Sequence, residues 1–196
     1  VLAAFEAGSI VRAYPMRGTV FLLAAEDVLW VSELCNSTAV RSARKRSPSL
    51  GLEDQHFAVA QDTLESLAQG GISRRRLFDA WGDHGVSPDS GRGYHLLKHF
   101  ISTGIAHYGG WDGKENLLHL SEGKLPPGST LEHRFNGDRT AAAAELMRRY
   151  FTTRGPATID DMAWWSKLPK RLLNEAAAQL TDLEHGHVFD LEQVAY

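Results

Sequence analysis

Apolar residues recur at helical spacing in the last third of the sequence and predict three short helices. The first covers residues 141–153 and is expected to end at Gly155, and the second opens behind Thr158 as its N-terminal cap. The third covers residues 170–180, and residues 183–194 then favour strands. Short helices with sharp turns between them, followed by strands, indicate a helix-turn-helix with a wing.

The same order of elements occurs earlier in the sequence. Three predicted helices have matching lengths and turns: residues 53–69, 74–81 and 91–103. Ser73 is expected to cap the second of them. Two β-prone segments with a turn between them come next: residues 105–110 and 116–120. This order predicts a second helix-turn-helix with its own hairpin wing.

A further β-hairpin is predicted near the start, from residues 10–14 and 19–23, and Glu26-Asp27 opens an amphipathic helix after it. The fold class is therefore α+β, mainly helical, with tandem winged-helix units and β-hairpin wings. Three domains follow from this order. They are the end of a first winged helix with its hairpin and basic helix, a second winged helix, and a truncated third: residues 1–50, 51–128 and 129–196.

Composition places the chain among globular proteins, because 43% hydrophobic and 23% charged residues are enough to form real cores. The lone Cys35 cannot form an internal disulfide, and no apolar run is as long as a membrane span. We therefore expect a cytoplasmic protein with no membrane partner, associated with the nucleoid if it binds DNA. Residue 1 is Val1 within an apolar, helix-like run without a cap, so we expect a further segment upstream.

The net charge of −3 excludes a protein coated in cations for indiscriminate nucleic-acid binding, so local clusters must carry any contact with DNA. Arg12 and Arg17 are expected near the hairpin tip, within reach of phosphate, although solvated arginines on an ordinary hairpin give the same pattern. Four more cations stand in one run without an acid: Arg41, Arg44, Lys45 and Arg46. Such a run lies along a DNA backbone, or is a solvated helix end or a linker.

The helix over residues 91–103 suits a recognition helix. Tyr94, Leu97 and Ile101 share one face, which we expect to pack inward. Four polar residues share the opposite face: Arg92, His95, His99 and Ser102. That face is expected to be free to enter a major groove.

The third unit also has a basic character. Residues 138–171 hold seven cations against four acids in a chain that is net acidic. Arg154, Lys170 and Arg171 are the candidates for contact with DNA in this unit.

No catalytic constellation is visible, and we predict neither a metal nor an organic cofactor. His95 with His99, and His185 with His187, have spacings that suit a shared metal, but no cysteine pair or zinc-protease glutamate accompanies them. We interpret these histidines as structural or DNA-facing. Asp160-Asp161 is expected to stabilise a helix N-terminus. The sequence has no phosphate-cradling glycine loop and no nucleophile motif.

Two motifs together with the tandem plan resemble the AlkZ/YcaQ-like winged-helix family, and the resemblance covers essentially the whole chain. The first is Arg-Ala-Tyr-Pro-Met-Arg-Gly-Thr at residues 12–19, followed by Leu22-Leu23 and Glu26-Asp27. The second is Arg-Gly-Pro-Ala-Thr at residues 154–158, with Trp165 after it.

The resemblance implies a DNA-binding protein whose partner is double-stranded, damaged DNA. Characterised members look like monofunctional DNA glycosylases that excise alkylated bases, some of which open interstrand crosslinks, without a cofactor. Arg17, Gly18 and Thr19 match the family's hairpin, where the glycine supplies a tight turn and the arginine a phosphate or minor-groove contact. Phe21 stands where the family usually has histidine. The family's catalytic Gln-x-Gln or Gln-x-Asp motif is expected upstream, so no catalytic residue is assigned here.

The leading hypothesis is therefore a DNA glycosylase-like repair protein that acts on alkylated or crosslinked duplex DNA, with its catalytic motif outside this chain. The alternative is a non-enzymatic winged-helix DNA-binding protein, such as a transcription regulator or a repair accessory protein. Phe21 favours this alternative. Winged helices that mediate protein contacts are a third possibility, which the acidic net charge permits.

Overall fold

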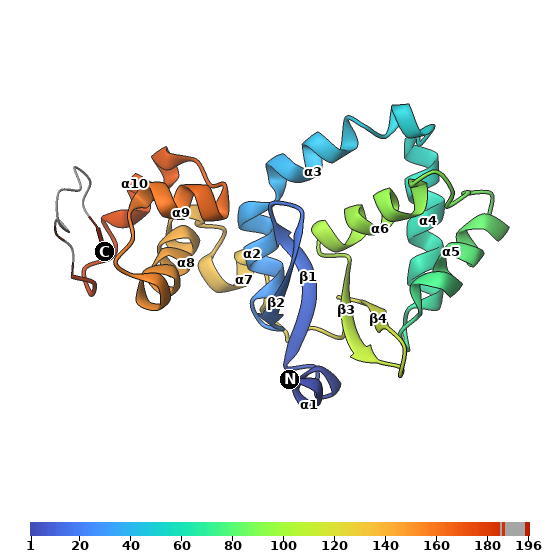
Figure 1. Cartoon of the computed structure of the whole chain (residues 1–196), viewed down its shortest axis with the longest axis horizontal. Helices are drawn as coiled ribbons and strands as arrows, with labels where there is room; N and C mark the ends of the chain where they lie inside the picture. Colours follow the sequence, from blue (N-terminus) through green and yellow to red (C-terminus); the bar gives the residue numbers. More distant parts are fainter. Residues whose placement is uncertain (185, 187–194) are drawn as a thin grey trace. The chain divides into compact units, whose positions relative to one another are not determined.

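The computed structural model describes residues 1–184, 186, 195 and 196, and the chain divides into two compact units, Val1–Ser129 and Thr130–Tyr196. The first unit combines helices with a small antiparallel sheet, and the second is helical over the described residues, which agrees with an α+β class (Figure 1). No helix in the described part of the chain is both long and apolar enough to span a membrane.

The first unit contains four strands and six α-helices within the described residues (Figure 1). The strands are β1 (Ile10–Met16), β2 (Thr19–Ala24), β3 (Ala106–Trp111) and β4 (Asn116–Leu120). The helices are α1 (Leu2–Glu6), α2 (Val28–Cys35), α3 (Ser37–Arg44), α4 (Asp54–Leu67), α5 (Arg74–Asp83) and α6 (Arg92–Ser102), with a 3-10 turn η1 (Pro48–Leu50) between α3 and α4. All the helices and both hairpins predicted from the sequence in this region are present.

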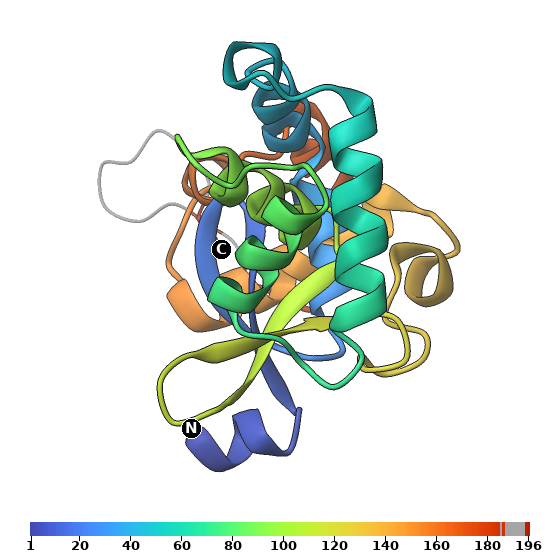
Figure 2. The same cartoon turned by 90° about the vertical axis from the view of Figure 1, so that its right-hand side faces the viewer.

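Both hairpins belong to one sheet, whose strand order is β2-β1-β3-β4. The central pairing is antiparallel and places Arg12 of β1 opposite Tyr108 of β3. Figures 1 and 2 both place α1 at the end of the sheet where β1 begins and α3 beyond the opposite end, next to the β1–β2 turn. The two hairpins that the sequence analysis assigned to different domains are therefore neighbours, while the division at residues 50 and 128 stays a prediction.

The core of the first unit lies between the sheet and helices α4 to α6. Trp81 of α5 is fully buried, and its indole nitrogen donates a hydrogen bond to the carbonyl oxygen of Ala60 in α4 at 2.9 Å. Leu96, Phe100 and Ala106 lie in the same cluster and are inaccessible to solvent. This packing holds α6 against the sheet and so places its N-terminal and outward-facing residues.

The expected orientation of α6 is wrong in part. Leu97 and Ile101 are buried as predicted, but Tyr94 is 56% exposed, while Ser102, predicted to be on the free polar face, is 7% exposed. The polar face is covered because α3 and the start of α4 pack across it. Phe57 of α4 is buried in this contact, with the His99 ring edge-on to it at a centroid distance of 4.9 Å.

The second unit contains α7 (Leu131–Phe135), α8 (Arg139–Arg154), α9 (Ile159–Ser166) and α10 (Lys170–Ala177). Thr158 and Asp161 form a reciprocal capping box at the start of α9, so Asp161 stabilises the helix N-terminus as predicted. Gly155 is needed because a Cβ there would lie 2.7 Å from the carbonyl oxygen of Phe151. The strands predicted over residues 183–194 fall mostly outside the described residues. Ala195 forms isolated β-bridges to Thr158 and Gly186.

Candidate nucleic-acid interface

The tip of the β1–β2 hairpin is a two-residue turn made by Arg17 and Gly18. Met16 pairs with Thr19 across it, and both turn residues have positive φ angles, 59° and 65°. This is the backbone of a type I′ turn, in which glycine is favoured at the second position because it has no Cβ. Arg17 and Thr19 are exposed. The hairpin residues that match the family motif therefore form a rigid, solvent-accessible tip.

Arg12 does not lie near this tip, which corrects the sequence-based expectation. It sits within β1, paired with Leu22 on one side and Tyr108 on the other. Its guanidinium carbon lies 4.7 Å from the centroid of the Tyr108 ring, and its buried Nε has no hydrogen-bond partner among the described residues. Arg12 is therefore held against the sheet by an aromatic ring, and phosphate contact by Arg12 stays a prediction.

The basic run after α2 is divided between surface and interior. Arg41 lies in α3, Lys45 and Arg46 follow this helix, and all three are exposed. Arg44 turns inward, pairs with Asp54 and places its guanidinium carbon 3.6 Å from the centroid of the Phe57 ring. Much of the charge of Arg44 is thus already compensated within the fold, whereas the other three cations face solvent.

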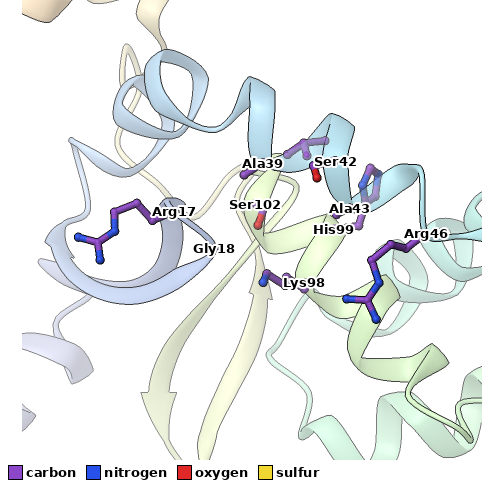
Figure 3. A pocket seen from close by; sticks show the side chains of 10 residues that line it. Arg17, Gly18, Ala39, Ser42, Ala43, Arg46, Lys98, His99 and Ser102 are labelled. Carbon is purple, nitrogen blue, oxygen red and sulfur yellow. The ribbon is translucent and has the colours of Figure 1, made fainter. Parts of the chain in front are cut away.

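A pocket of about 270 Å³ opens between the hairpin turn, α3 and α6 (Figure 3). Its lining residues come from three separate segments: Arg17 and Gly18; Ala39, Val40, Ser42, Ala43 and Arg46; and Lys98, His99 and Ser102. None of these described residues is acidic. Lys98 is exposed and projects from α6 toward Gly18, whereas Arg17 points away from Lys98 (Figure 3). Lys98 stands between His95 and His99 in the sequence and was not among the predicted site residues.

The two histidines on α6 face this basic region but are largely neutral at pH 7. His95 shares a hydrogen bond of 3.0 Å with the Ser47 hydroxyl, and burial followed by the charges of Arg46 and Arg44 lowers its pKa. Burial, then Arg44, lowers the pKa of His99 to about 4. Both rings are half-buried against Phe57, so this face of α6 is partly covered, and contact of His95 and His99 with DNA stays a prediction.

Arg92 opens α6 and is also partly buried, with an Nε that has no hydrogen-bond partner in the described residues. A bound anion could satisfy this nitrogen only by reaching below the surface. The structure therefore leaves Lys98, not Arg92, as the accessible cation on the outer side of α6.

The three cations predicted to bind DNA in the second unit each have a partner within that unit. Lys170 pairs with Asp160 at 2.8 Å, and Arg171 pairs with Glu175 at 2.9 Å on the same helix. Arg154 lies 5.4 Å from the centroid of the Trp165 ring, and Trp165 in turn packs against Tyr150. Exposed ion pairs of this kind are weak and exchange readily, so these contacts do not prevent a contact with phosphate.

The His119 side chain packs within the first unit, next to the ring of a second histidine, His107. The rings of His107 and His119 pair across β3 and β4, and their centroids are 5.9 Å apart. His107 is buried, with its Nδ1 3.3 Å from the Ser121 hydroxyl, and burial lowers its pKa to about 4. A pocket of about 310 Å³, lined also by Glu6 and Lys124, opens beside these rings.

Metal-binding groups do not gather in the part of the chain that the structure describes, where no three His, Cys, Asp or Glu side chains could hold one ion. His95 and His99 are instead engaged by Ser47 and Phe57. His185 and His187 lie outside the described residues. No metal site is therefore assigned among the described residues.

The fold is similar to that of Streptomyces sahachiroi DNA glycosylase AlkZ, with a TM-score of 0.66 and 16% sequence identity. The match covers 98% of this chain and 54% of that chain, so this chain spans about half the length of that protein. No curated protein matches the sequence significantly. A family model described as DNA glycosylase AlkZ-like matches residues 1–194. The family predicted from the two sequence motifs is thus confirmed, and the chain belongs to the AlkZ-like DNA glycosylase family.

Proposed function

We propose that this chain is the DNA-binding part of a DNA glycosylase-like repair protein that acts on alkylated or crosslinked duplex DNA through tandem winged-helix units. Membership of the AlkZ-like family supports the class of activity. The observation that carries the proposal is the juxtaposition of the Arg17-Gly18 turn with the exposed Arg46 of the segment after α2, at one pocket. A projecting hairpin beside a cationic surface suits contact with the groove and backbone of one duplex.

The cations and the hairpin turn have different roles because their chemistry differs. Arg41, Lys45 and Arg46 neutralise phosphates, which supplies affinity that depends on salt but carries no sequence information. The hairpin turn lies at the lesion, where its tight backbone allows close approach. Water attack on the glycosidic carbon is supported by the glutamine motif that the family carries upstream of this hairpin. In this scheme the chain positions DNA, and it does not itself supply the catalytic group.

The experiment is fluorescence polarisation of two labelled duplexes, one intact and one with an abasic-site analogue, across a salt series. We expect tighter binding to the abasic duplex and a linear fall of log K with log salt concentration. Arg17→Ala should reduce the preference for the abasic duplex, whereas Arg75→Ala should not. Arg75 is a matched control because it is an exposed arginine on α5, with Asp79 beside it at 3.9 Å. Absence of binding at low salt would refute the proposal.

A non-enzymatic winged-helix DNA-binding protein is the second candidate, and Phe21 favours it. Phe21 occupies the position where the family usually has histidine, and lies opposite Ala13 in the β1–β2 hairpin. The phenyl ring of Phe21 has no nitrogen, so it cannot position water by hydrogen bonding as imidazole does. Equal affinity for the two duplexes, combined with preference for a palindromic sequence, would support this candidate over the repair protein.

A further inference from the structure

We propose that the pocket between the hairpin turn, α3 and α6 binds one backbone phosphate of DNA, with Lys98 and Arg46 as its cationic ligands. This inference deepens the proposed function and rests on it. Lys98 lies outside both family motifs, and the site is a discrete phosphate site instead of a diffuse basic surface.

Lys98 is placed by the fold to reach the hairpin. Its Cα lies on α6, whose opposite face is locked into the core by Leu96, Leu97 and Phe100, so the helix cannot rotate. Its ammonium group approaches the turn so closely that a Cβ at Gly18 would lie 2.7 Å from Nζ. The hairpin turn and α6, far apart in sequence, therefore meet at this ammonium group (Figure 3).

Lys98 and Arg46 have no acidic partner among the described residues, although both are exposed and both line the pocket. Two ion pairs in the first unit involve other residues: Arg44 with Asp54, and Arg75 with Asp79. The positive charges of Lys98 and Arg46 at one pocket repel each other, and an anion bound there offsets this repulsion by its attraction to both. A phosphate oxygen would accept hydrogen bonds from both, and charge-assisted bonds of this type are the stronger ones.

The groups around the pocket reinforce this preference for an anion. Burial, followed by the charges of Arg46, Arg44 and Lys98, lowers the pKa of His95, so the positive potential of these cations reaches the outer side of α6. Burial, followed by the charge of Arg44, lowers the pKa of His99 to about 4, so His99 offers polar ring atoms at the pocket wall but no positive charge at pH 7. Ser42 supplies a hydroxyl on the α3 side.

The lining of the pocket favours a phosphate over a flipped base. The pocket has a volume of about 270 Å³. The lining is cationic and polar at the rim, with Ala39, Val40 and Ala43 as apolar walls and the half-buried His99 ring beside them. No phenylalanine, tyrosine or tryptophan, the larger rings on which a base stacks, is among these lining residues. The hollow therefore suits a phosphodiester that passes over it.

The first test is the salt dependence of duplex binding by Lys98→Ala, Lys98→Arg and the control Arg75→Ala. Loss of one phosphate contact should reduce the slope of log K against log salt by roughly 0.9, because one fewer counterion is released. Lys98→Arg keeps the charge and should retain the slope, as should Arg75→Ala. Lys98 is exposed, so unchanged thermal midpoints are expected and confirm that the variants are folded.

The second test places the phosphate on the DNA. Each phosphate of the duplex near the hairpin contact is replaced in turn by a neutral methylphosphonate, and affinity is measured for wild type and Lys98→Ala. One position should weaken the wild type severalfold and leave Lys98→Ala almost unaffected, because the two changes remove the same contact. Inorganic phosphate at matched ionic strength should compete only weakly, which separates a phosphodiester site from a site for free phosphate.

Two results would overturn the phosphate site while leaving the proposed function intact: an unchanged salt slope for Lys98→Ala, or no methylphosphonate position coupled to Lys98, in a wild-type protein that binds duplex DNA. Strong competition by inorganic phosphate, with duplex affinity insensitive to Lys98→Ala, would also overturn it. Failure of the wild type to bind duplex DNA at low salt would refute the proposed function, and the phosphate site with it.

Discussion

A single buried amide holds together the elements that form the pocket, and its removal is expected to destabilise the first unit. Asn36 lies between α2 and α3 and is 2% exposed. Its Nδ2 donates one hydrogen bond to the carbonyl oxygen of Tyr14 in β1 and one, at 3.0 Å, to the carbonyl oxygen of Ser102 at the end of α6. The hairpin strand, the start of α3 and the end of α6 therefore share one side chain.

The magnitude for Asn36→Ala follows from these contacts. Two hydrogen bonds are lost at roughly 1 kcal/mol each, and the two carbonyl oxygens that lose a donor add about 1 kcal/mol or more if water cannot reach them. Part of this loss of stability is offset, because Oδ1 of Asn36 is buried and has no hydrogen-bond partner in the described residues. The substitution removes the desolvation cost of that oxygen as well. We expect the free energy of unfolding to fall by about 2 kcal/mol.

The assay is urea unfolding at pH 7, followed by the affinity for duplex DNA. Ser32→Ala is the matched control, because Ser32 of α2 is 4% exposed and its hydroxyl has no hydrogen-bond partner in the described residues. Removing an unpaired buried hydroxyl should leave stability unchanged or raise it slightly. If Asn36→Ala is no more destabilising than Ser32→Ala, the amide does not hold the three elements, and the reasoning is refuted.

Two further predictions concern stability. The pKa of His107 is lowered to about 4, so the neutral form is favoured in the fold. The contribution of neutral His107 to the free energy of unfolding is therefore present above pH 6.5 and is lost as the pH falls toward 4, by up to about 3 kcal/mol. Urea unfolding of wild type and His107→Gln at several pH values checks this. Equal pH dependence of the two proteins would contradict it. Thr158→Ala removes a cap that accepts from the Asp161 amide at 3.1 Å. This substitution should lower the unfolding free energy of the second unit by about 1 kcal/mol. The control Thr152→Ala, at an exposed position within α8, should lower it less. Equal losses in the two variants would disprove the capping argument.

Elements with local signals could be predicted from the sequence. Ser73 and Thr158 cap α5 and α9 as expected, because a side-chain oxygen that accepts from the helix N-terminus depends only on its neighbours in sequence. The Arg17-Gly18 turn is of the same kind. Pairing between β1 and β3 could not be predicted, because antiparallel neighbours far apart in sequence leave no local pattern. The single sheet is therefore information that only the structure supplies.

The face of α6 shows why polarity alone misassigns surfaces. The sequence pattern places His99 on a free polar face of the helix, but its ring packs edge-on to Phe57 and is half-buried. The apolar faces of imidazole and the stem of an arginine can be buried while their polar atoms find partners. Tyr94 shows the converse: it is exposed, yet its ring contacts Phe78 at a centroid distance of 5.4 Å. Both assignments needed knowledge of what covers the helix.

The cations available for contact with DNA depend on where the fold places them, not on their number in the sequence. Arg44 stands within the basic run, yet it packs on Phe57 and pairs with Asp54. Lys98 stands outside that run, yet it meets Arg46 at one pocket. A count of basic residues therefore overestimates the contribution of the run and omits α6. Since each phosphate contact contributes separately to the salt dependence of binding, the slope measures how many cations contact phosphate, and its change in single variants identifies which ones.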